Sequence, residues 1–188
     1  MSSTLKITPF GIKEVRTSVL LKENDPILRQ KSIPWDFSNP PENALDLSRE
    51  LIETCKSYGG LGLSAVQIGK PYRVFCIGLM NEFQICFNPS VIITVDELKP
   101  TTEIEGCLSY PGLVLKVARS NQINVEFYMP NGELRQHEFQ GLTARCFLHE
   151  LDHLDGIVFT DRVGTMSLMR AKDARRKFIK QVERRRKK

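Results

Sequence analysis

The chain has 188 residues, of which 41% are apolar and 26% are charged, proportions that exclude a wholly disordered, collagen-like or coiled-coil protein. No apolar run approaches the roughly eighteen residues that a membrane span requires. The net charge of +5 is unevenly distributed. Residues 170–188 carry eleven basic and two acidic side chains (+9), whereas residues 1–169 carry sixteen basic and twenty acidic side chains (−4). We therefore expect the C-terminal tail, rather than the body, to bind polyanions.

The N-terminal residues lack the apolar segment of a secretory signal, and Pro9 and Glu14 suit an organellar transit peptide poorly. Five cysteines are an odd number without a secretory context, which favours reduced thiols. We therefore expect a cytoplasmic or prokaryote-like location, with any special cysteine serving a metal ion or chemistry. The cysteines are Cys55, Cys76, Cys86, Cys107 and Cys146.

The first forty residues are expected to be irregular, because prolines at 26, 34, 40 and 41 interrupt any long element. A helix is predicted over about 41–58, where apolar residues recur at helical spacing until Gly59-Gly60 ends the pattern. Short runs rich in β-forming residues follow at 74–79, 85–87 and 91–95.

A hairpin is predicted next, because apolar and polar residues alternate over 123–128 and Asn131-Gly132 turns the chain into a return strand ending near Phe139. A second helix is predicted over about 141–154, and a third from about 165 through the basic tail. One narrow stripe of the third helix can dock on the body: Ala171, Ala174, Phe178 and Val182. Helices at the ends with antiparallel strands between them are typical of an α+β fold.

The strongest chemical signal is His149-Glu150-Leu151-Asp152-His153 on the second helix. This H-x-x-x-H spacing places two imidazoles one turn apart on one face, where both can bind one metal ion, and the glutamate beside the first can touch a metal-bound water. A polar helix face with i,i+4 pairs is the plainer alternative.

A hydrolytic metal site usually has a third protein ligand. No histidine follows His153, and His137 lies in the polar alternation of the return strand, where exposure is expected. The better candidate is Cys107 in Glu105-Gly-Cys-Leu-Ser-Tyr-Pro-Gly112, interpreted as a loop with exposed backbone that holds a thiolate; an isolated cysteine is otherwise more often a core residue.

Small residues gather in a third segment, Gly60-Leu-Gly-Leu-Ser-Ala-Val-Gln-Ile-Gly69. They permit close approach of a ligand to the backbone, and Gln67 adds a neutral donor. A tight connection between a helix and a strand explains such a segment equally well.

Together the three segments resemble the peptide deformylase family, whose signatures are G-x-G-L-A-A-x-Q, E-G-C-L-S and H-E-x-D-H-L-x-G. The resemblance runs from about Ser18 to the C-terminus, and Asp25-Pro-Ile-Leu-Arg29 is similar to the family's start. Two positions depart from the pattern: Ser64 replaces the usual alanine, and Leu148 replaces the glutamine often found before the first histidine. We interpret both as distant from metal ligands and proton-transfer groups.

The resemblance implies an α+β fold with antiparallel strands wrapped around a central HExxH helix and a C-terminal basic helix. It implies a hydrolase of protein biosynthesis that removes the N-formyl group from formyl-methionine on nascent polypeptides and releases formate. A catalytic domain would span 18–164, preceded by an extension of unknown role (1–17) and followed by the basic helix (165–188). We expect a monomer without membrane contact.

The resemblance also implies a role for each residue. Cys107, His149 and His153 would hold one divalent ion, which is Fe2+ in the cell, with Zn2+ or Ni2+ possible in a purified sample. Glu150 would carry protons. The Gln67 side chain and the Leu108 backbone N–H would stabilise the oxyanion.

Substrate backbone would pair in strand fashion with Leu61, Gly62 and Gly106. The methionine side chain would enter a pocket floored by Leu142 and Cys146, which lie two turns and one turn before His149, with the stem of Arg145 covering it. Glu105 and Arg119 form a plausible ion pair that braces the Cys107 loop.

Two other functions are compatible with the residues. A metallopeptidase that cuts internal peptide bonds would share the HExxH helix, but this chain lacks the third metal ligand that such enzymes take from downstream of the motif. A ribosome- or RNA-binding module with a structural metal is the other, against which the intact Glu150 and Gln67 argue. For the deformylase, we expect residues 170–188 to contact ribosomal RNA through phosphates.

Overall fold

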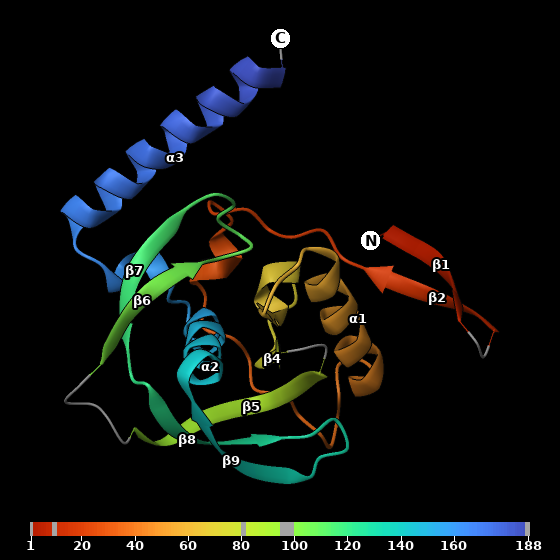
Figure 1. The fold of residues 1–188 in the computed structure, drawn as a ribbon. Coiled ribbons are helices and arrows are strands. Elements are labelled where there is room, and N and C mark those ends of the chain that lie inside the picture. The colour runs from red at the N-terminus through yellow and green to blue at the C-terminus, as the bar shows by residue number, and fades with distance from the viewer. Residues whose placement is uncertain (1, 9–10, 80–81, 95–99, 187–188) are drawn as a thin grey trace.

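The computed structural model describes residues 2–8, 11–79, 82–94 and 100–186. The strands and helices, all but β3 labelled in Figure 1, are β1 (Ser2–Thr8), β2 (Gly11–Thr17), α1 (Ala44–Ser57), β3 (Gly62–Ser64), β4 (Val74–Leu79), β5 (Glu82–Thr94), β6 (Thr101–Gly106), β7 (Val114–Arg119), β8 (Gln122–Tyr128), β9 (Leu134–Gln140), α2 (Gly141–Leu154) and α3 (Thr165–Arg186). Three short 3-10 helices are η1 (Pro26–Arg29), η2 (Ala65–Ile68) and η3 (Phe159–Arg162). No helix among these residues is long and apolar enough to span a membrane.

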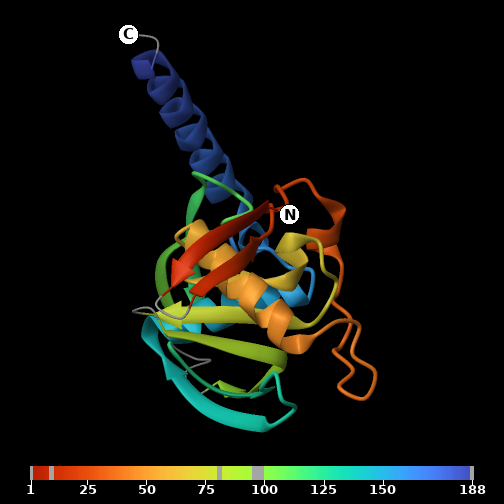
Figure 2. The same cartoon turned by 90° about the vertical axis from the view of Figure 1, so that its right-hand side faces the viewer.

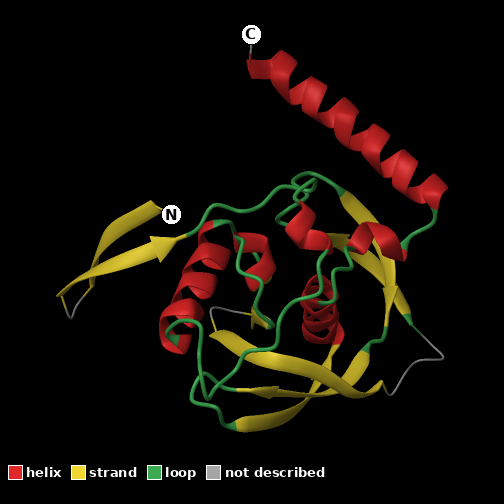
Figure 3. Ribbon diagram, turned by 180° about the vertical axis from the view of Figure 1, so that it is seen from behind, coloured by secondary structure: helices red, strands yellow, loops and turns green. Residues whose placement is uncertain are grey.

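Helix α2 lies in the middle of the molecule (Figure 1), and the view from behind in Figure 3 shows the same arrangement. A five-stranded antiparallel sheet in the order β3-β4-β5-β8-β9 curves around one side of α2, and the hairpin β6–β7 lies on another. The expected α+β fold, with antiparallel strands wrapped around the HExxH helix, is confirmed.

The core explains why α2 is central. Its residues Ala144, Phe147 and Leu154 are fully buried against β4, β5 and β8, and the rings of Phe75 and Phe147 meet edge to face at 5.0 Å. Burial of a side chain of this size contributes about 1.5–3 kcal/mol. The alternation predicted for β8 is present, since Ile123, Val125 and Phe127 are all buried.

Helix boundaries follow local sequence signals. Helices α2 and α3 begin at the predicted residues. Helix α1 begins three residues later than expected because Asn43, rather than Pro41, ends the irregular segment: the Asn43 side chain accepts hydrogen bonds from the N–H groups of Leu45 and Asp46.

The runs predicted at 85–87 and 91–95 are one strand, so their separation was wrong; residues 95–99 lie outside the described part of the chain. Pro89 falls at a register shift between Phe87 and Ser90, where a missing N–H does not break a ladder bond. Asn88 takes the left-handed φ of 47° that this bulge requires, and its side chain pairs with both backbone groups of Trp35.

Several strands were missed. The first forty residues are not wholly irregular, because β1 and β2 form a hairpin that lies beside α1 in Figure 2. Short β3 also went unpredicted. The hairpin β6–β7 includes Glu105 and Gly106, which were expected in a loop. In β7 the buried positions are Leu115, Val117 and Arg119, so a charged residue interrupts the apolar alternation.

Docking of the α3 stripe on the body was wrong for most of its length. Ala171 packs with Leu168 against the cluster around Tyr110 and Phe159, but Ala174 and Phe178 are exposed, Phe178 by 61%. The helix runs away from the body after its first turns (Figures 1 and 2), so its later positions cannot reach the core. An ion pair between Arg175 Nη1 and Glu23 Oε2, at 2.8 Å, connects this part of α3 to the N-terminal part of the body.

Candidate metal centre and active site

Two helical histidines and one cysteine converge beside the middle of α2. Cys107, just after β6, and His149 and His153 on α2 place one ligand atom each within 4.8 Å of the others. Cys107 Sγ lies 3.2 Å from His153 Nε2. One thiolate and two imidazoles form a donor set suited to divalent transition-metal ions, and such buried donors need a partner. The residues therefore fit the expected metal ion.

Neighbouring groups set the protonation of the two imidazoles differently. Burial lowers the pKa of His149, but hydrogen bonds with Cys107 and Glu105 outweigh it and raise this pKa to about 10. Burial and the positive charges of His149 and Arg119 hold the pKa of His153 well below its usual value. Without an ion His153 is therefore neutral, whereas His149 holds a proton that a bound ion would displace.

A buried carboxylate orients the first histidine. Glu105 Oε2 lies 3.1 Å from His149 Nδ1, which directs the other ring nitrogen toward Cys107. Glu105 also accepts from Arg119 at 2.6 and 3.0 Å and from Arg145 Nη1 at 2.7 Å. Burial alone raises the pKa of Glu105, but the bonds with His149 and Arg119 prevail and lower it to about 2. The Glu105–Arg119 ion pair expected from the sequence is present.

The network extends to Asp152, which the sequence analysis did not assign, and to Arg145, which was expected only to cover the methionine pocket. Asp152, between the two histidines in sequence, accepts from Arg119 Nη1 at 2.8 Å and from Arg162 Nε at 3.0 Å. Arg145 also donates to the carbonyl oxygens of Val117 (2.9 Å) and Thr101 (2.8 Å). Its guanidinium braces the hairpin β6–β7 against α2. The position of Asp152, three residues after His149, is the signal that could have identified it.

Glu150 faces the same cavity as the ligands and is 3% exposed. Burial raises the pKa of Glu150, while the charge of His149 and a hydrogen bond with Ser64 oppose the rise. Ser64 Oγ donates to Glu150 Oε2 at 2.5 Å. The expectation that Ser64 avoids proton-transfer groups was therefore wrong. Leu148 instead packs at the edge of the core around Phe147.

Gln67 lies in η2, close to the ligand Cys107. Its Oε1 accepts from the Ser64 N–H at 2.9 Å, which fixes the orientation of the amide. Its Nε2 then points to Cys107 Sγ at 3.6 Å and to Ser109 Oγ at 3.2 Å. The predicted donor therefore faces the metal ligands, and Leu108, the next residue after Cys107, lines the same cavity.

A cavity of about 500 Å³ opens over the centre, a size usual for small-ligand sites. The structure brings the predicted site residues into its wall, except His153, which lies 1% exposed beneath it. Those in the wall are Leu61, Gly62, Gln67, Gly106, Cys107, Leu108, Leu142, Arg145, Cys146, His149 and Glu150. His137, by contrast, is exposed on β9 as expected.

The two site glycines differ in what surrounds them. A Cβ on Gly62 would lie 2.5 Å from Glu150 Oε1, so this glycine makes room for the Glu150 carboxylate. A Cβ on Gly106 would meet nothing closer than 3.8 Å, so that residue leaves space in the cavity. The Leu61 carbonyl oxygen accepts from the Gly78 N–H (2.8 Å) and the Cys146 thiol (3.2 Å). A substrate strand would therefore pair with Leu61 through another group, its N–H.

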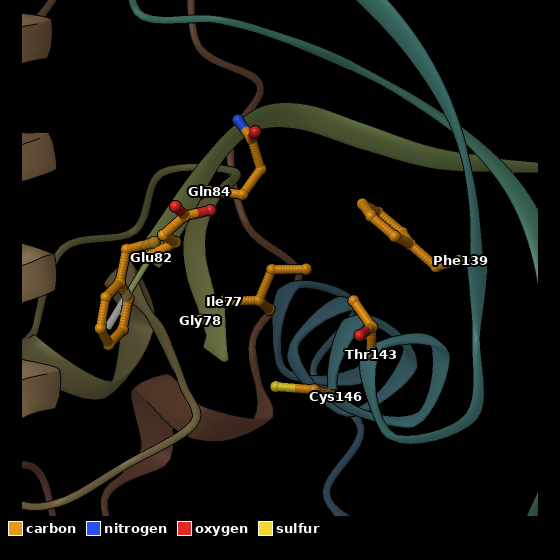
Figure 4. Close-up of a pocket in the computed structure, with 8 residues that line it drawn as sticks. Ile77, Gly78, Glu82, Gln84, Phe139, Thr143 and Cys146 are labelled. Carbon is orange, nitrogen blue, oxygen red and sulfur yellow. The ribbon is translucent and has the colours of Figure 1, made fainter. Parts of the chain in front are cut away.

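A second, smaller cavity of about 280 Å³ lies on the other side of Cys146. Figure 4 shows Thr143 and Cys146 on α2 facing Ile77 and Gly78 on β4, with Phe139 at one edge. Burial raises the pKa of the Cys146 thiol well above its usual value, so this thiol, which lines both cavities, favours its protonated form.

Comparisons with known proteins agree with this geometry. The family model described as polypeptide deformylase matches residues 18–168. A peptide deformylase from Thermotoga maritima is 36% identical over 141 residues, which are 74% of this chain and 82% of that protein. The structure of a Synechococcus elongatus peptide deformylase in complex with actinonin matches with a TM-score of 0.78 and 31% identity, over 84% of this chain and 85% of that chain. A Met-Ala-Ser-bound peptide deformylase from Acinetobacter baumannii matches with a TM-score of 0.73 and 27% identity, over 79% and 99%.

Proposed function

The chain belongs to the polypeptide deformylase family and is a metallohydrolase with peptide deformylase activity, and from this premise we propose how its residues divide the reaction. The observation that carries the proposal is the convergence of Cys107, His149 and His153 with Glu150 and Gln67 around one cavity. Residues 18–164 form the catalytic domain, and 1–17 and 165–188 are additions to it.

Cys107, His149 and His153 would hold one divalent ion, and such an ion would supply Lewis-acid chemistry at the cavity. Fe2+ is the ion that the resemblance implies for the cell, and Zn2+ or Ni2+ suit the same ligands. Glu105 keeps His149 oriented, and Arg119 keeps Glu105 ionised. Metal analysis of protein purified with and without oxygen tests the identity of the ion.

The formyl-methionyl end of a nascent polypeptide lies along the cavity wall formed by Leu61, Gly62 and Gly106. The N–H of Leu61 and the open space at Gly106 suit an extended backbone. The methionine side chain points toward Leu142 and Cys146 on α2. The Met-Ala-Ser peptide bound by the Acinetobacter baumannii relative supports a substrate of this kind.

Glu150 takes a proton from the attacking water and delivers it to the leaving amine, so that formate and a free N-terminus result. Gln67 Nε2 and the Leu108 N–H donate to the oxygen of the formyl group as negative charge develops there. The closed surroundings of Glu150, only 3% exposed, keep bulk water from competing for the proton.

Release of formate from formyl-Met-Ala-Ser by anaerobically purified protein tests this division of roles. Glu150→Gln keeps the metal ion and loses about 10²–10⁴-fold in turnover. Gln67→Ala loses about a hundredfold through the missing donor. Formate release by Glu150→Gln at the parent rate contradicts the proton-transfer role. Cleavage of N-blocked internal peptides instead would favour the metallopeptidase alternative.

The tail suggests where the enzyme meets its substrate. Lys172, Arg176, Lys177 and Lys180 are exposed on the part of α3 that leaves the body. Newly made formyl-methionyl chains emerge beside ribosomal RNA, and a helix of this charge suits its phosphates. The enzyme therefore docks on the ribosome near the exit tunnel through residues 170–188. It acts as a monomer, in the cytoplasm or a prokaryote-like compartment. Binding of RNA without formate release would favour the non-catalytic alternative.

A further inference from the structure

Ser64 lies where β3 gives way to η2 and is completely buried. Its hydroxyl has two oxygens of one residue within reach: Glu150 Oε2 at 2.5 Å and the Glu150 main-chain oxygen at 3.1 Å. The two residues are 86 positions apart in the sequence. The contact therefore joins the small-residue segment to the HExxH helix at the proton-carrying side chain.

The hydroxyl contact is separable from the rest of the site. The backbone N–H of Ser64, not its side chain, holds Gln67 Oε1 at 2.9 Å. A substitution at position 64 thus removes the link to Glu150 and retains the backbone N–H that donates to Gln67 Oε1. No hydrogen bond of the Ser64 side chain to Cys107, His149 or His153 is among those of the described residues.

The contact fixes one carboxylate oxygen and leaves the other for chemistry. Glu150 Oε1 lies against Gly62, so close that a Cβ there would be 2.5 Å away, whereas Oε2 is held by Ser64. A buried carboxylate oxygen without a donor carries a desolvation cost and gains from moving toward another partner. The hydroxyl removes that tendency and keeps the side chain in one position.

We propose that Ser64 is a positioning residue, which holds the Glu150 side chain by its Oε2 oxygen. The Ser64 hydroxyl donates to Oε2 at 2.5 Å, so the other oxygen, Oε1 against Gly62, is kept in one place for chemistry. An alanine at position 64 lacks this donor and leaves the carboxylate free to move.

The proposal rests on the role of Glu150 as the proton carrier, and its test compares two buried serines on the full-length, metal-loaded protein. Ser32 is the matched control, because its hydroxyl donates to the Leu154 carbonyl oxygen at 2.7 Å on the same helix, away from the cavity. Ser64→Ala lowers kcat on formyl-Met-Ala-Ser by about tenfold and leaves KM within about twofold. Ser32→Ala changes kcat by less than about twofold.

Infrared difference spectroscopy gives a readout apart from activity. The carboxylate band of Glu150 is the one lost in Glu150→Gln, and it shifts in Ser64→Ala but not in Ser32→Ala. In the Glu150→Gln background, Ser64→Ala causes no further loss of turnover, because the partners act together.

An unchanged kcat in Ser64→Ala, an unshifted band, or a tenfold loss that persists in the Glu150→Gln background would each overturn the proposal. The metal content of the variant equals that of the parent, which separates this effect from ligand loss. If the parent protein itself releases no formate, the proposed function fails, whereas the band shift still reports on the Ser64–Glu150 contact.

Discussion

Single side chains at the centre derive their properties from burial combined with specific partners. Glu105 shows this best: burial opposes its charge, yet Arg119, Arg145 and His149 together satisfy both carboxylate oxygens. Because an ionised Glu105 fixes the ring of His149, the ligand geometry exists before an ion arrives. The geometry of the centre therefore depends on residues outside the set of metal ligands.

Cys107→Ala is expected to lower metal affinity at least tenfold, since one of three ligands is lost. Metal content after dialysis is the measurement. Cys86→Ala is the control, because this thiol is fully buried between β5 and α2 and belongs to no ligand group among the described residues. Full stoichiometry in Cys107→Ala would remove this residue from the ligand set.

Leu142→Trp is expected to raise KM for formyl-Met peptides by at least about tenfold, while turnover of formyl-Gly and formyl-Ala peptides changes much less. The reason is steric, because Leu142 lines the cavity at the first turn of α2. Leu134→Trp, at a similarly exposed leucine on β9, controls for the added aromatic surface. Equal losses on all peptides would place Leu142 outside the methionine pocket.

Elements far apart in sequence are tied together by buried polar links as well as by the apolar core. Arg145 and Arg119 join β6–β7 to α2, which keeps Cys107 beside the two histidines. On the other side of the molecule, Lys70 after η2 pairs with Glu50 on α1 at 2.8 Å and with Glu42 at 2.6 Å. Because these ion pairs hold helices and strands together only while both partners are charged, the stability of the fold depends on pH.

The pKa of Lys70 gives this sensitivity a sign. Burial lowers this pKa, but the hydrogen bonds and charges of Glu42 and Glu50 outweigh burial and raise it above 10.5. A pKa that is higher in the folded state gives stability that is complete below the unfolded value and is lost as pH rises through the folded value.

Lys70→Met is accordingly expected to lower the free energy of unfolding at pH 8 by about 1–3 kcal/mol, and the difference from the parent should shrink at pH 11. Urea unfolding at both pH values measures it. Lys56→Met, whose ion pair with Glu53 spans 3.9 Å at the surface, should cost less than about 0.5 kcal/mol at pH 8. A difference for Lys70→Met that is constant with pH would contradict the assignment.

The whole molecule separates its charge in space. The acidic body surrounds the metal centre, and α3 carries the excess of positive charge away from it (Figure 1). Among the described residues, contacts between α3 and the body are made through Leu168, Ala171 and Arg175, near the start of the helix. The proposed docking through the rest of α3 can therefore be tested without altering the metal centre.

Truncation after Met169 is expected to abolish co-sedimentation with ribosomes at low salt and to keep activity on short formyl peptides within a few-fold. Binding by the intact chain should weaken steeply with salt because counterions are released. The combined variant Lys172→Glu, Lys177→Glu, Lys180→Glu tests charge alone, since these exposed residues leave the contacts with the body intact. Undiminished pelleting of both variants would show that α3 is not the docking element.

The chemistry of the centre could be predicted from local patterns of residues. Histidines four residues apart require only a helix to share a face, so His149, His153 and Glu150 were identifiable from local spacing. Helix starts and the alternation in β8 were equally local, because caps, turns and periodicity involve only neighbouring residues. The resemblance of three linked motifs to one family added Cys107 and Gln67 to the predicted site.

Contacts between residues far apart in the sequence could not be predicted in this way. Ser64 reaches Glu150, Arg119 interrupts an apolar strand to pair with Glu105, and β5 continues through Pro89 because Asn88 is held by Trp35. Each depends on groups that meet after folding, where burial turns an ordinary hydrogen bond into a strong constraint. The direction of α3 belongs here too: its apolar stripe permits docking, but the path of the chain after η3 carries most of it away from the core.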